Sequence, residues 1–248
     1  MIVEVGTGGW PASAMALGLG VWISFGWCWW TCPQGRRLEM VATFGIVMAA
    51  AIGGGLISSW IVGERGLSSL GGIVGGATSL VFVQKPWAYR GRQMLDCLVP
   101  GGLMGLSVAR LGCLFEGCDF GRLSHSGLAV VHHEGSRAWT VHLHQYGLDP
   151  ARQMSLEVYP FAAYLALWGV FCAAVGEWIR RRGGSPGRAA TAGAALFFAG
   201  GGAIEWLREP QTVPQLISGV SVYPSIYLCL ALIALGLWWY FGPLDTQQ

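Results

Sequence analysis

The stretch from Met94 to Phe115 reads MLDCLVPGGLMGLSVARLGCLF, an apolar run of about 20 residues, which is the length of a membrane-spanning helix. Its charged side chains are Asp96 near the start and Arg110 near the end. A charged side chain inside a membrane is costly, so it faces a partner or water. Arg110 is therefore expected to meet an anion.

The composition of the whole chain indicates the same class of protein. Of its 248 residues, 53% are hydrophobic and 11% are charged, and 13 are tryptophan. These values are typical of a polytopic membrane protein. A net charge of +2, without a basic run, argues against a nucleic-acid partner. We expect a single membrane domain over residues 1–248, with its first helix retained because no basic segment precedes it.

Further apolar runs predict an all-α membrane fold. Seven transmembrane helices are expected, at residues 11–31, 40–62, 67–84, 94–115, 156–179, 189–207 and 216–241. The long loop 116–155, between the fourth and fifth helices, is expected to form a small periplasmic cap. Glycine-rich segments at 53–55, 71–76, 101–105 and 200–202 predict close helix packing and permit a cavity between helices.

The cations of the connecting loops predict the orientation in the membrane. One set of loops carries nine Lys or Arg residues, at positions 36, 37, 85, 90, 92, 180, 181, 182 and 188. The other set carries five, at positions 65, 122, 137, 152 and 208. Because cationic loops stay in the cytoplasm, the amino terminus and loop 116–155 are expected outside and the carboxyl terminus inside.

The ionisable residues of the apolar segments suggest a site. Asp96 lies near the expected start of the fourth helix, where a carboxylate can cap backbone N–H groups. Arg110 and Glu205 fall near the outer ends of the fourth and sixth helices, so they could pair across the bundle. Two interpretations stay open. The residues could form a structural salt bridge with no catalytic role, or Arg110, supported by Arg208, could bind the phosphate of a lipid headgroup.

All five histidines lie in loop 116–155, at positions 125, 132, 133, 142 and 144. Their spacing, and that of Cys113 and Cys118, differs from the usual spacing of zinc ligands, so we expect neither a metal nor a cofactor. The alternation of apolar and polar residues at 129–132 and 139–144 predicts two short strands. A loop histidine could still act as a base near neutral pH.

Four segments resemble those of a known family. Residues 110–122, RLGCLFEGCDFGR, resemble the signature of prolipoprotein diacylglyceryl transferases, Gly-Arg-x-Gly-Asn-Phe-x-Asn-Gly-Glu-x-x-Gly-Arg. In the same order along the chain, residues 66–76 resemble the family's Gly-x-Ser-x-His-Gly-Gly helix, 96–100 its Asp-x-x-x-Pro lead-in, and 203–210 its Glu-x-x-Arg-x-Pro segment.

The resemblance implies a multi-pass enzyme of lipoprotein biosynthesis in the bacterial inner membrane. Such enzymes move the diacylglyceryl group of phosphatidylglycerol onto the lipobox cysteine of a prolipoprotein. The implied partners are phosphatidylglycerol, the prolipoprotein signal peptide and membrane lipid. The catalytic residues are then expected to be Arg110, Glu205 and Asp119, and the substrate-binding residues Arg110, Gly112, Glu116, Gly121, Arg122 and Arg208.

The chain also departs from the family pattern. Leu70 stands where the family has a histidine, and Gly201 where it has an arginine. Cys113 and Cys118 replace an asparagine and a glutamate. Leucine cannot transfer a proton. Two alternatives therefore stay open: a catalytically reduced paralogue that binds phospholipid or lipoprotein segments, and a related membrane transferase or transporter for another lipid or peptide.

Overall fold

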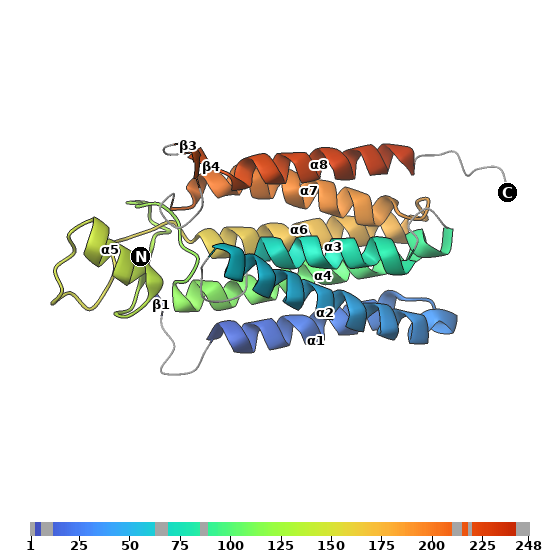
Figure 1. The fold of residues 1–248 in the computed structure, drawn as a ribbon, viewed down its shortest axis with the longest axis horizontal. Coiled ribbons are helices and arrows are strands. Elements are labelled where there is room, and N and C mark those ends of the chain that lie inside the picture. The colour runs from blue at the N-terminus through green and yellow to red at the C-terminus, as the bar shows by residue number, and fades with distance from the viewer. Residues whose placement is uncertain are drawn as a thin grey trace.

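The computed structural model describes residues 3–5, 12–62, 69–84, 89–209, 215–217 and 220–241. The described chain forms a bundle of long helices with a smaller cap at one end (Figure 1). Several residues considered in the sequence lie outside the described ranges: Arg65, residues 66–68, Lys85 and Pro210.

The long helices overlap all seven predicted segments. They are α1 (Ala12–Thr31), α2 (Arg37–Val62), α3 (Ser69–Gln84), α4 (Tyr89–Glu116), α6 (Phe161–Arg181), α7 (Arg188–Ile204) and α8 (Tyr223–Tyr240). Six segments of the described chain are long and apolar enough to cross a membrane. The remaining helix, α3, has 16 residues. Large apolar side chains such as Trp22, Trp60 and Phe82 point outward, as expected for faces that contact lipid.

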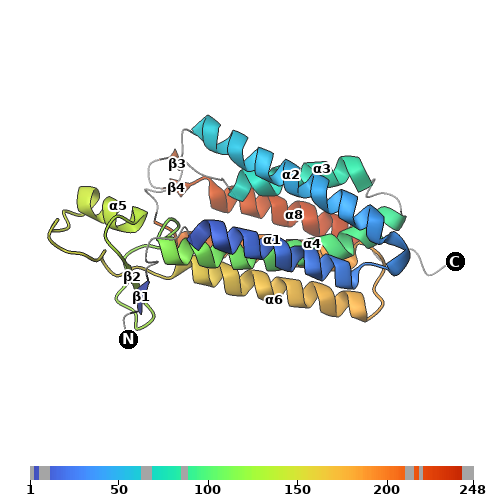
Figure 2. The same ribbon diagram turned by 90° about the horizontal axis from the view of Figure 1, so that it is seen from below.

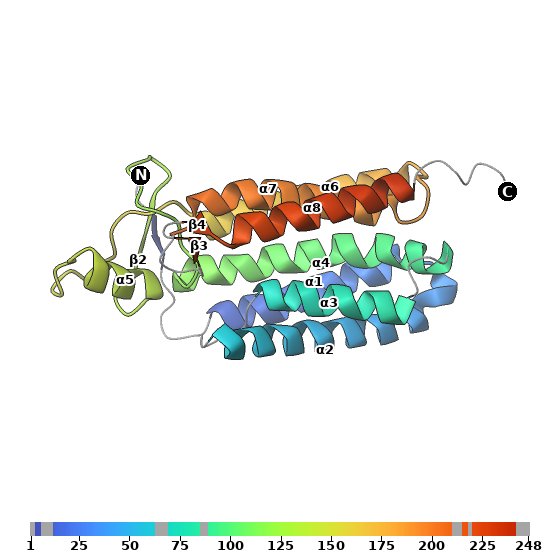
Figure 3. The same cartoon turned by 45° about the horizontal axis from the view of Figure 1, so that its top comes forward.

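Helix α4 is the central element of the bundle. It packs against α1, α6 and α7, while α2 packs on α3 and α7 on α8. Figure 3 shows the consequence: α4 runs between a group formed by α1, α2 and α3 and a group formed by α6, α7 and α8. Figure 2 shows α1 lying along α4. The helix that carries Arg110 is therefore covered on several sides.

Glycines set the distance between α1 and α4. A Cβ atom on Gly20 would lie 2.4 Å from the carbonyl oxygen of Gly105, and one on Gly105 would lie 2.5 Å from that of Gly20. Contacts this short are not tolerated, so both positions require glycine. The predicted role of the 101–105 glycine segment in close packing is confirmed at this crossing.

Replacement of Gly20 by valine should therefore separate α1 from α4. We expect a loss of about 2 kcal/mol or more of stability, since overpacking of a tight contact commonly costs 1–3 kcal/mol. Gly18→Val, two residues away, is the matched control because nothing lies within 4 Å of its added Cβ. Thermal unfolding in detergent measures both variants, and equal losses would contradict this explanation.

The end of the bundle opposite the cap is rich in arginine and aromatic residues. Guanidinium groups lie over aromatic rings in four pairs: Arg37 on Trp29, Arg92 on Phe241, Arg182 on Trp178 and Arg188 on Trp238. Such amphipathic pairs suit the boundary between lipid and water. Most of the cations of the more basic loop set thus gather at one end of the bundle.

Three helix starts differ from the sequence prediction by five residues or more. Helix α4 begins at Tyr89 rather than 94, which makes it about 42 Å long at 1.5 Å per residue. Hydropathy misses its first turns because they contain Arg90, Arg92 and Gln93. Helix α6 begins at Phe161 rather than 156, directly after Pro160, which has no N–H to donate. Helix α8 begins at Tyr223 rather than 216, after strands β3 (Gln215–Ile217) and β4 (Val220–Ser221).

The cap contains one of the two strands predicted for it. Residues Val130–His132 form strand β2, which pairs in parallel with β1 (Val3–Val5). The prediction of a strand at 139–144 is wrong, because helix α5 spans Arg137–Gln145. The Ser136 hydroxyl accepts a hydrogen bond from the Trp139 N–H at 3.1 Å and caps the helix. Ala138 and His142, four residues apart, form its buried face, so helical spacing overrides the apparent alternation.

Candidate functional site

The candidate site lies where α4 ends and the cap begins. Arg110 is in the last two turns of α4 and is 7% exposed. The helix ends at Glu116, and Gly117 follows with a φ of 63°. This left-handed residue reverses the chain direction, as at many helix ends. Asp119 is thereby directed back to Arg110, and the Arg110 Nη1 donates a hydrogen bond to the Asp119 Oδ2.

Residues from the end of α7 complete the cluster. After α7, Glu205–Leu207 form the short 3-10 helix η2, which places Glu205 and Arg208 on the same side. The Arg208 Nε lies 2.8 Å from the Glu205 Oε2, and its Nη1 lies 3.2 Å from the Asp119 Oδ1. Arg110 and Arg208 thus share Asp119, and Glu205 pairs with Arg208. We call these four side chains the arginine–carboxylate cluster.

The cluster is largely removed from solvent. The Asp119 side chain is 10% exposed and that of Glu205 is 1% exposed. The Arg208 guanidinium lies 4.6 Å from the ring centre of Phe161 and 5.2 Å from that of Tyr223. Two cations and two carboxylates balance, which reduces the cost of burying them. Because aromatic faces hold Arg208 on two sides, its position is fixed before any ligand binds.

Gly121 and Arg122 join the two chain segments that carry the cluster. The Arg122 N–H donates to the Leu207 carbonyl at 2.8 Å, and Gly121 pairs with Arg208 in an antiparallel bridge. A Cβ on Gly121 would lie 2.7 Å from the Tyr159 carbonyl oxygen. The glycine is required there for backbone packing. The exposed Arg122 donates from its Nε to the Arg208 carbonyl at 3.3 Å.

Two other predicted site residues face α1 rather than the cluster. The Glu116 Oε1 accepts a hydrogen bond from the Ser13 N–H at 2.7 Å, in the first turn of α1. A carboxylate there interacts favourably with the positive end of the helix dipole. A Cβ on Gly112 would lie 2.7 Å from the Ser13 Cα. Both residues therefore fix α4 against α1.

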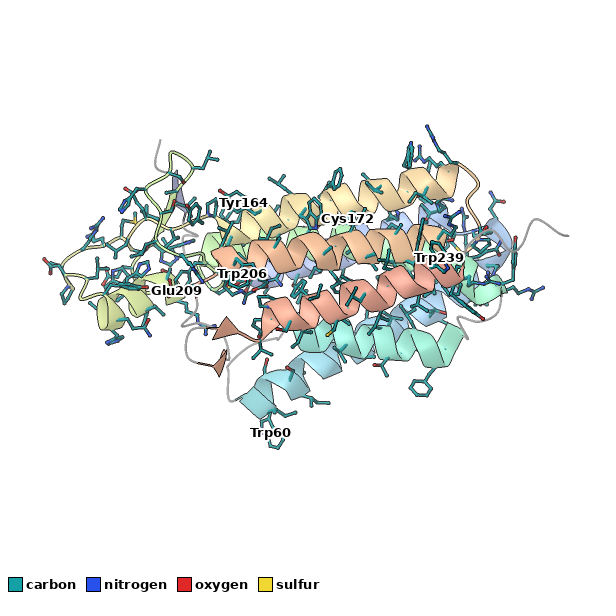
Figure 4. The ribbon with its side chains drawn as sticks, turned by 90° about the horizontal axis from the view of Figure 1, so that it is seen from above. Trp60, Tyr164, Cys172, Trp206, Glu209 and Trp239 are labelled. Carbon is teal, nitrogen blue, oxygen red and sulfur yellow. The ribbon has the colours of Figure 1, made fainter. Side chains whose placement is uncertain are left out.

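The sequence analysis missed Glu209, which lies next to the cluster. Its side chain is 2% exposed, and its N–H donates to the Phe120 carbonyl at 3.2 Å. The Tyr146 hydroxyl of the cap donates to the Glu209 Oε1 at 3.2 Å, and burial together with this carboxylate raises the pKa of Tyr146. Figure 4 shows Glu209 at the base of the cap. The sequence could have indicated Glu209 as a site residue, because it directly follows Arg208 in the segment EWLREP.

An apolar groove of about 470 Å³ lies on the outside of the bundle near the cluster. It is lined by Tyr164, Leu167, Trp168, Ile204 and Leu207, from α6, α7 and η2. Figure 4 shows Tyr164 and the nearby Trp206 toward the cap end of the bundle. Ile204 and Leu207 flank Glu205 in the chain, so the groove lies on the same segment that carries Glu205 and Arg208.

Two of the five histidines are buried inside the cap. His132 is 1% exposed and His142 is fully buried, and His142 Nδ1 accepts a hydrogen bond from the Leu156 N–H at 3.0 Å. Burial lowers the pKa of both imidazoles from 6.5 to about 4. Both are therefore neutral near pH 7.

The cap should consequently lose stability in acid. The unfolded histidines bind protons as the pH falls through 6.5, whereas the folded ones do so only near pH 4. The contribution of these two histidines to the stability of the cap is thus fully present above pH 6.5 and is lost as the pH falls toward 4. After division by the intrinsic exchange rate at each pH, the protection factors of the amides over residues 130–148 should decrease as the pH falls across this window. His142→Gln should weaken this pH dependence, while the exposed control His144→Gln should retain it; an unchanged profile in both would contradict the assignment.

Comparison with known proteins agrees with this arrangement. The family model for prolipoprotein diacylglyceryl transferase matches residues 32–241, which include the whole cluster. The chain belongs to this family. A phosphatidylglycerol–prolipoprotein diacylglyceryl transferase of Dehalococcoides mccartyi strain BAV1 is 27% identical over 167 residues, which are 60% of this chain and 61% of the relative. The protein of the same name from strain 195 is 30% identical over 142 residues, 50% of this chain and 53% of the relative.

The alignments therefore cover less than two thirds of these relatives. The family and the six apolar segments together indicate a multi-pass membrane protein. The predicted family and membrane class are thus confirmed.

Proposed function

We propose that the protein transfers the diacylglyceryl group of phosphatidylglycerol to the lipobox cysteine of a prolipoprotein, with the arginine–carboxylate cluster as its active site. The single observation that carries this proposal is the position of Asp119, whose carboxylate is shared by two arginines, Arg110, which is buried, and Arg208, whose side chain is 13% exposed. Two guanidinium groups that converge on one oxyanion form a site of the right charge and geometry for a phosphate.

In this proposal the phosphate takes the place that Asp119 occupies between Arg110 and Arg208. In the reaction, the thiol sulfur of the peptide bonds to the terminal glyceryl carbon, and the bond from that carbon to the phosphate oxygen breaks. Glycerol phosphate leaves with the electron pair, and the two arginines stabilise its growing negative charge. The thiol proton goes to a carboxylate, for which Asp119 and Glu205 are the candidates.

The surroundings of the cluster suit a lipid substrate. The apolar groove beside Ile204 and Leu207 offers a surface for an acyl chain, while the headgroup reaches the arginines. Gly112, Glu116 and Gly121 then act by fixing α4 and the cap, and Arg122 by fixing the segment that carries Arg208. We further propose that the amino terminus and the cap lie on the periplasmic side of the membrane and the carboxyl terminus in the cytoplasm, because the more cationic loops gather at the end opposite the cap.

Reconstitution provides the test of this function. The full chain is placed in vesicles containing phosphatidylglycerol and mixed with a lipobox peptide, and the mass of the peptide is followed. We expect a gain equal to one diacylglyceryl group at the cysteine. Vesicles of phosphatidylethanolamine alone should give none. Failure of several lipobox peptides to gain mass in the presence of phosphatidylglycerol would reject the transferase.

A second candidate, a paralogue that binds phospholipid without efficient transfer, is favoured by one observation. At Gly201, where the family has an arginine, a Cβ would lie 2.7 Å from the ring of Tyr227. An aromatic ring thus occupies the space of that side chain, as Leu70 occupies the histidine position in the sequence. Phosphatidylglycerol that copurifies with the protein, without transfer to any peptide, would support this candidate.

A further inference from the structure

Two cysteines meet at the turn that carries Asp119. Cys113 lies one turn after Arg110 in α4, and Cys118 follows Gly117. The Cys118 Sγ donates to the Cys113 carbonyl oxygen at 3.9 Å, which places the Cys118 thiol against the backbone of Cys113. Positions five residues apart come into contact here because a left-handed residue at a helix end folds the chain back on its last turn.

The turn has little freedom to open. Gly117 has a φ of 63°, and a Cβ at this position would lie 2.8 Å from the ring of His132. The ring of His132, which is 1% exposed, therefore packs directly against the turn. The backbone thus keeps the two cysteines together without needing a bond between their sulfur atoms.

Access distinguishes this pair from other cysteines of the chain. Cys113 and Cys118 are both partly exposed, whereas Cys28, Cys32, Cys97 and Cys172 are buried. A partly exposed dithiol can react with an external oxidant, while buried thiols remain inert. In the orientation proposed above, this end of the bundle faces the oxidising side of the membrane.

We propose that Cys113 and Cys118 are a reversible thiol–disulfide pair that tethers Asp119 to the end of α4. The oxidant is an external disulfide. A thiolate of the pair attacks it to give a mixed disulfide and one free thiol; the other cysteine then displaces the second thiol. In total, two cysteine thiols and one external disulfide become one internal disulfide and two external thiols.

The consequence for the cluster follows from chain connectivity. Asp119 is the residue after Cys118, so a closed disulfide adds a covalent link between its backbone and α4, while the reduced pair leaves it held by the turn and by its ion pairs with Arg110 and Arg208. This step deepens the proposed function, because Asp119 must leave the arginines for a phosphate to enter. The existence of the disulfide can nevertheless be tested without any activity measurement.

The chain offers a convenient readout for the test. Trypsin cleaves after Arg110 and Arg122 and releases residues 111–122, LGCLFEGCDFGR, which contain both cysteines and no others. The full-length protein in lipid is equilibrated with mixtures of reduced and oxidised glutathione, quenched in acid and alkylated. The reduced peptide carries two alkyl groups, whereas the oxidised one carries none and is lighter than the free dithiol by two hydrogens.

We expect the oxidised peptide to appear in one transition that depends on the square of the reduced glutathione concentration. Cys172 should stay alkylatable after unfolding and serves as the internal control. Cys229→Ser should leave the transition unchanged, and Cys113→Ser should allow only a glutathione adduct at Cys118. The proposed disulfide would be rejected if Cys113 and Cys118 were both alkylated after incubation with oxidised glutathione alone. It would also be rejected if the wild-type peptide carried only glutathione adducts.

Hydrogen exchange tests the tether separately. The amides of residues 117–121 should exchange several-fold more slowly in the oxidised protein than in the reduced protein. The same amides should show no redox difference in Cys113→Ser. Equal exchange in both redox states would reject the tether. Failure of the transferase assay would leave both readouts intact, so the two proposals can fail independently.

Discussion

Replacement of Arg110 by alanine should lower the rate of diacylglyceryl transfer by a factor of about 10² to 10³, the usual loss when one preorganised donor to a developing oxyanion is removed. Arg110 is buried at the end of α4 and converges with Arg208 on one point. Without it, half of the positive charge at the phosphate position is lost. Asp119 keeps Arg208 as a partner, so the fold should survive.

Two further variants separate this effect from loss of folding. Arg181→Ala removes an arginine at the opposite end of the bundle, whose side chain is 71% exposed, and should retain normal transfer. Arg110→Lys keeps the charge but loses the fork that binds two oxygens at once, so we expect partial activity. Peptide mass measures transfer, and retention on size exclusion measures folding. Full activity of a folded Arg110→Ala protein would remove Arg110 from the mechanism.

The sequence located the helices because their signal is local. A membrane-spanning segment is a continuous apolar run. Hydropathy therefore predicts the carboxyl-terminal end of each helix of the bundle to within a few residues. The starts of α4, α6 and α8 were missed because polar first turns, Pro160 and the β3–β4 segment interrupt the hydropathy signal. Residues 139–144 were predicted as a strand although they are helical. The residue that caps this helix, Ser136, precedes the segment and was not part of the alternating pattern.

The pairing within the site needed tertiary information. The sequence indicates only that Arg110 and Glu205 could pair, because both are charged residues near the same end of apolar helices. Their link runs through Asp119 and Arg208, and this depends on the left-handed turn at Gly117 and on the bend of η2 after α7. The buried Glu209 escaped notice because its partner, Tyr146, is 63 residues away. The sequence thus identifies the charged residues of the site, but the path of the folded backbone determines which of them form ion pairs.

The second large effect is expected at Asp96, on the same helix but far from the cluster. Its carboxylate was predicted to cap backbone N–H groups, and it does so for a different helix. The Asp96 Oδ2 accepts from the Gly187 N–H at 2.7 Å, and the Oδ1 accepts from the Ala190 N–H at 2.8 Å. Asp96 therefore fixes the start of α7 to α4. Since α7 leads directly into η2 with Glu205 and on to Arg208, this capping also helps to set the position of half the cluster.

Asp96→Ala should leave two buried N–H groups without an acceptor, at a cost of about 2–6 kcal/mol for the pair. Asp96→Asn keeps one carbonyl oxygen, so its loss should be about half as large. Glu39→Ala is the control, because Glu39 is 46% exposed and pairs with Arg36 at the surface, where such a pair contributes at most about 1 kcal/mol. Thermal unfolding in detergent ranks the three variants. If alanine and asparagine destabilise equally, the cost comes from the lost charge rather than from the two hydrogen bonds, and the capping explanation fails.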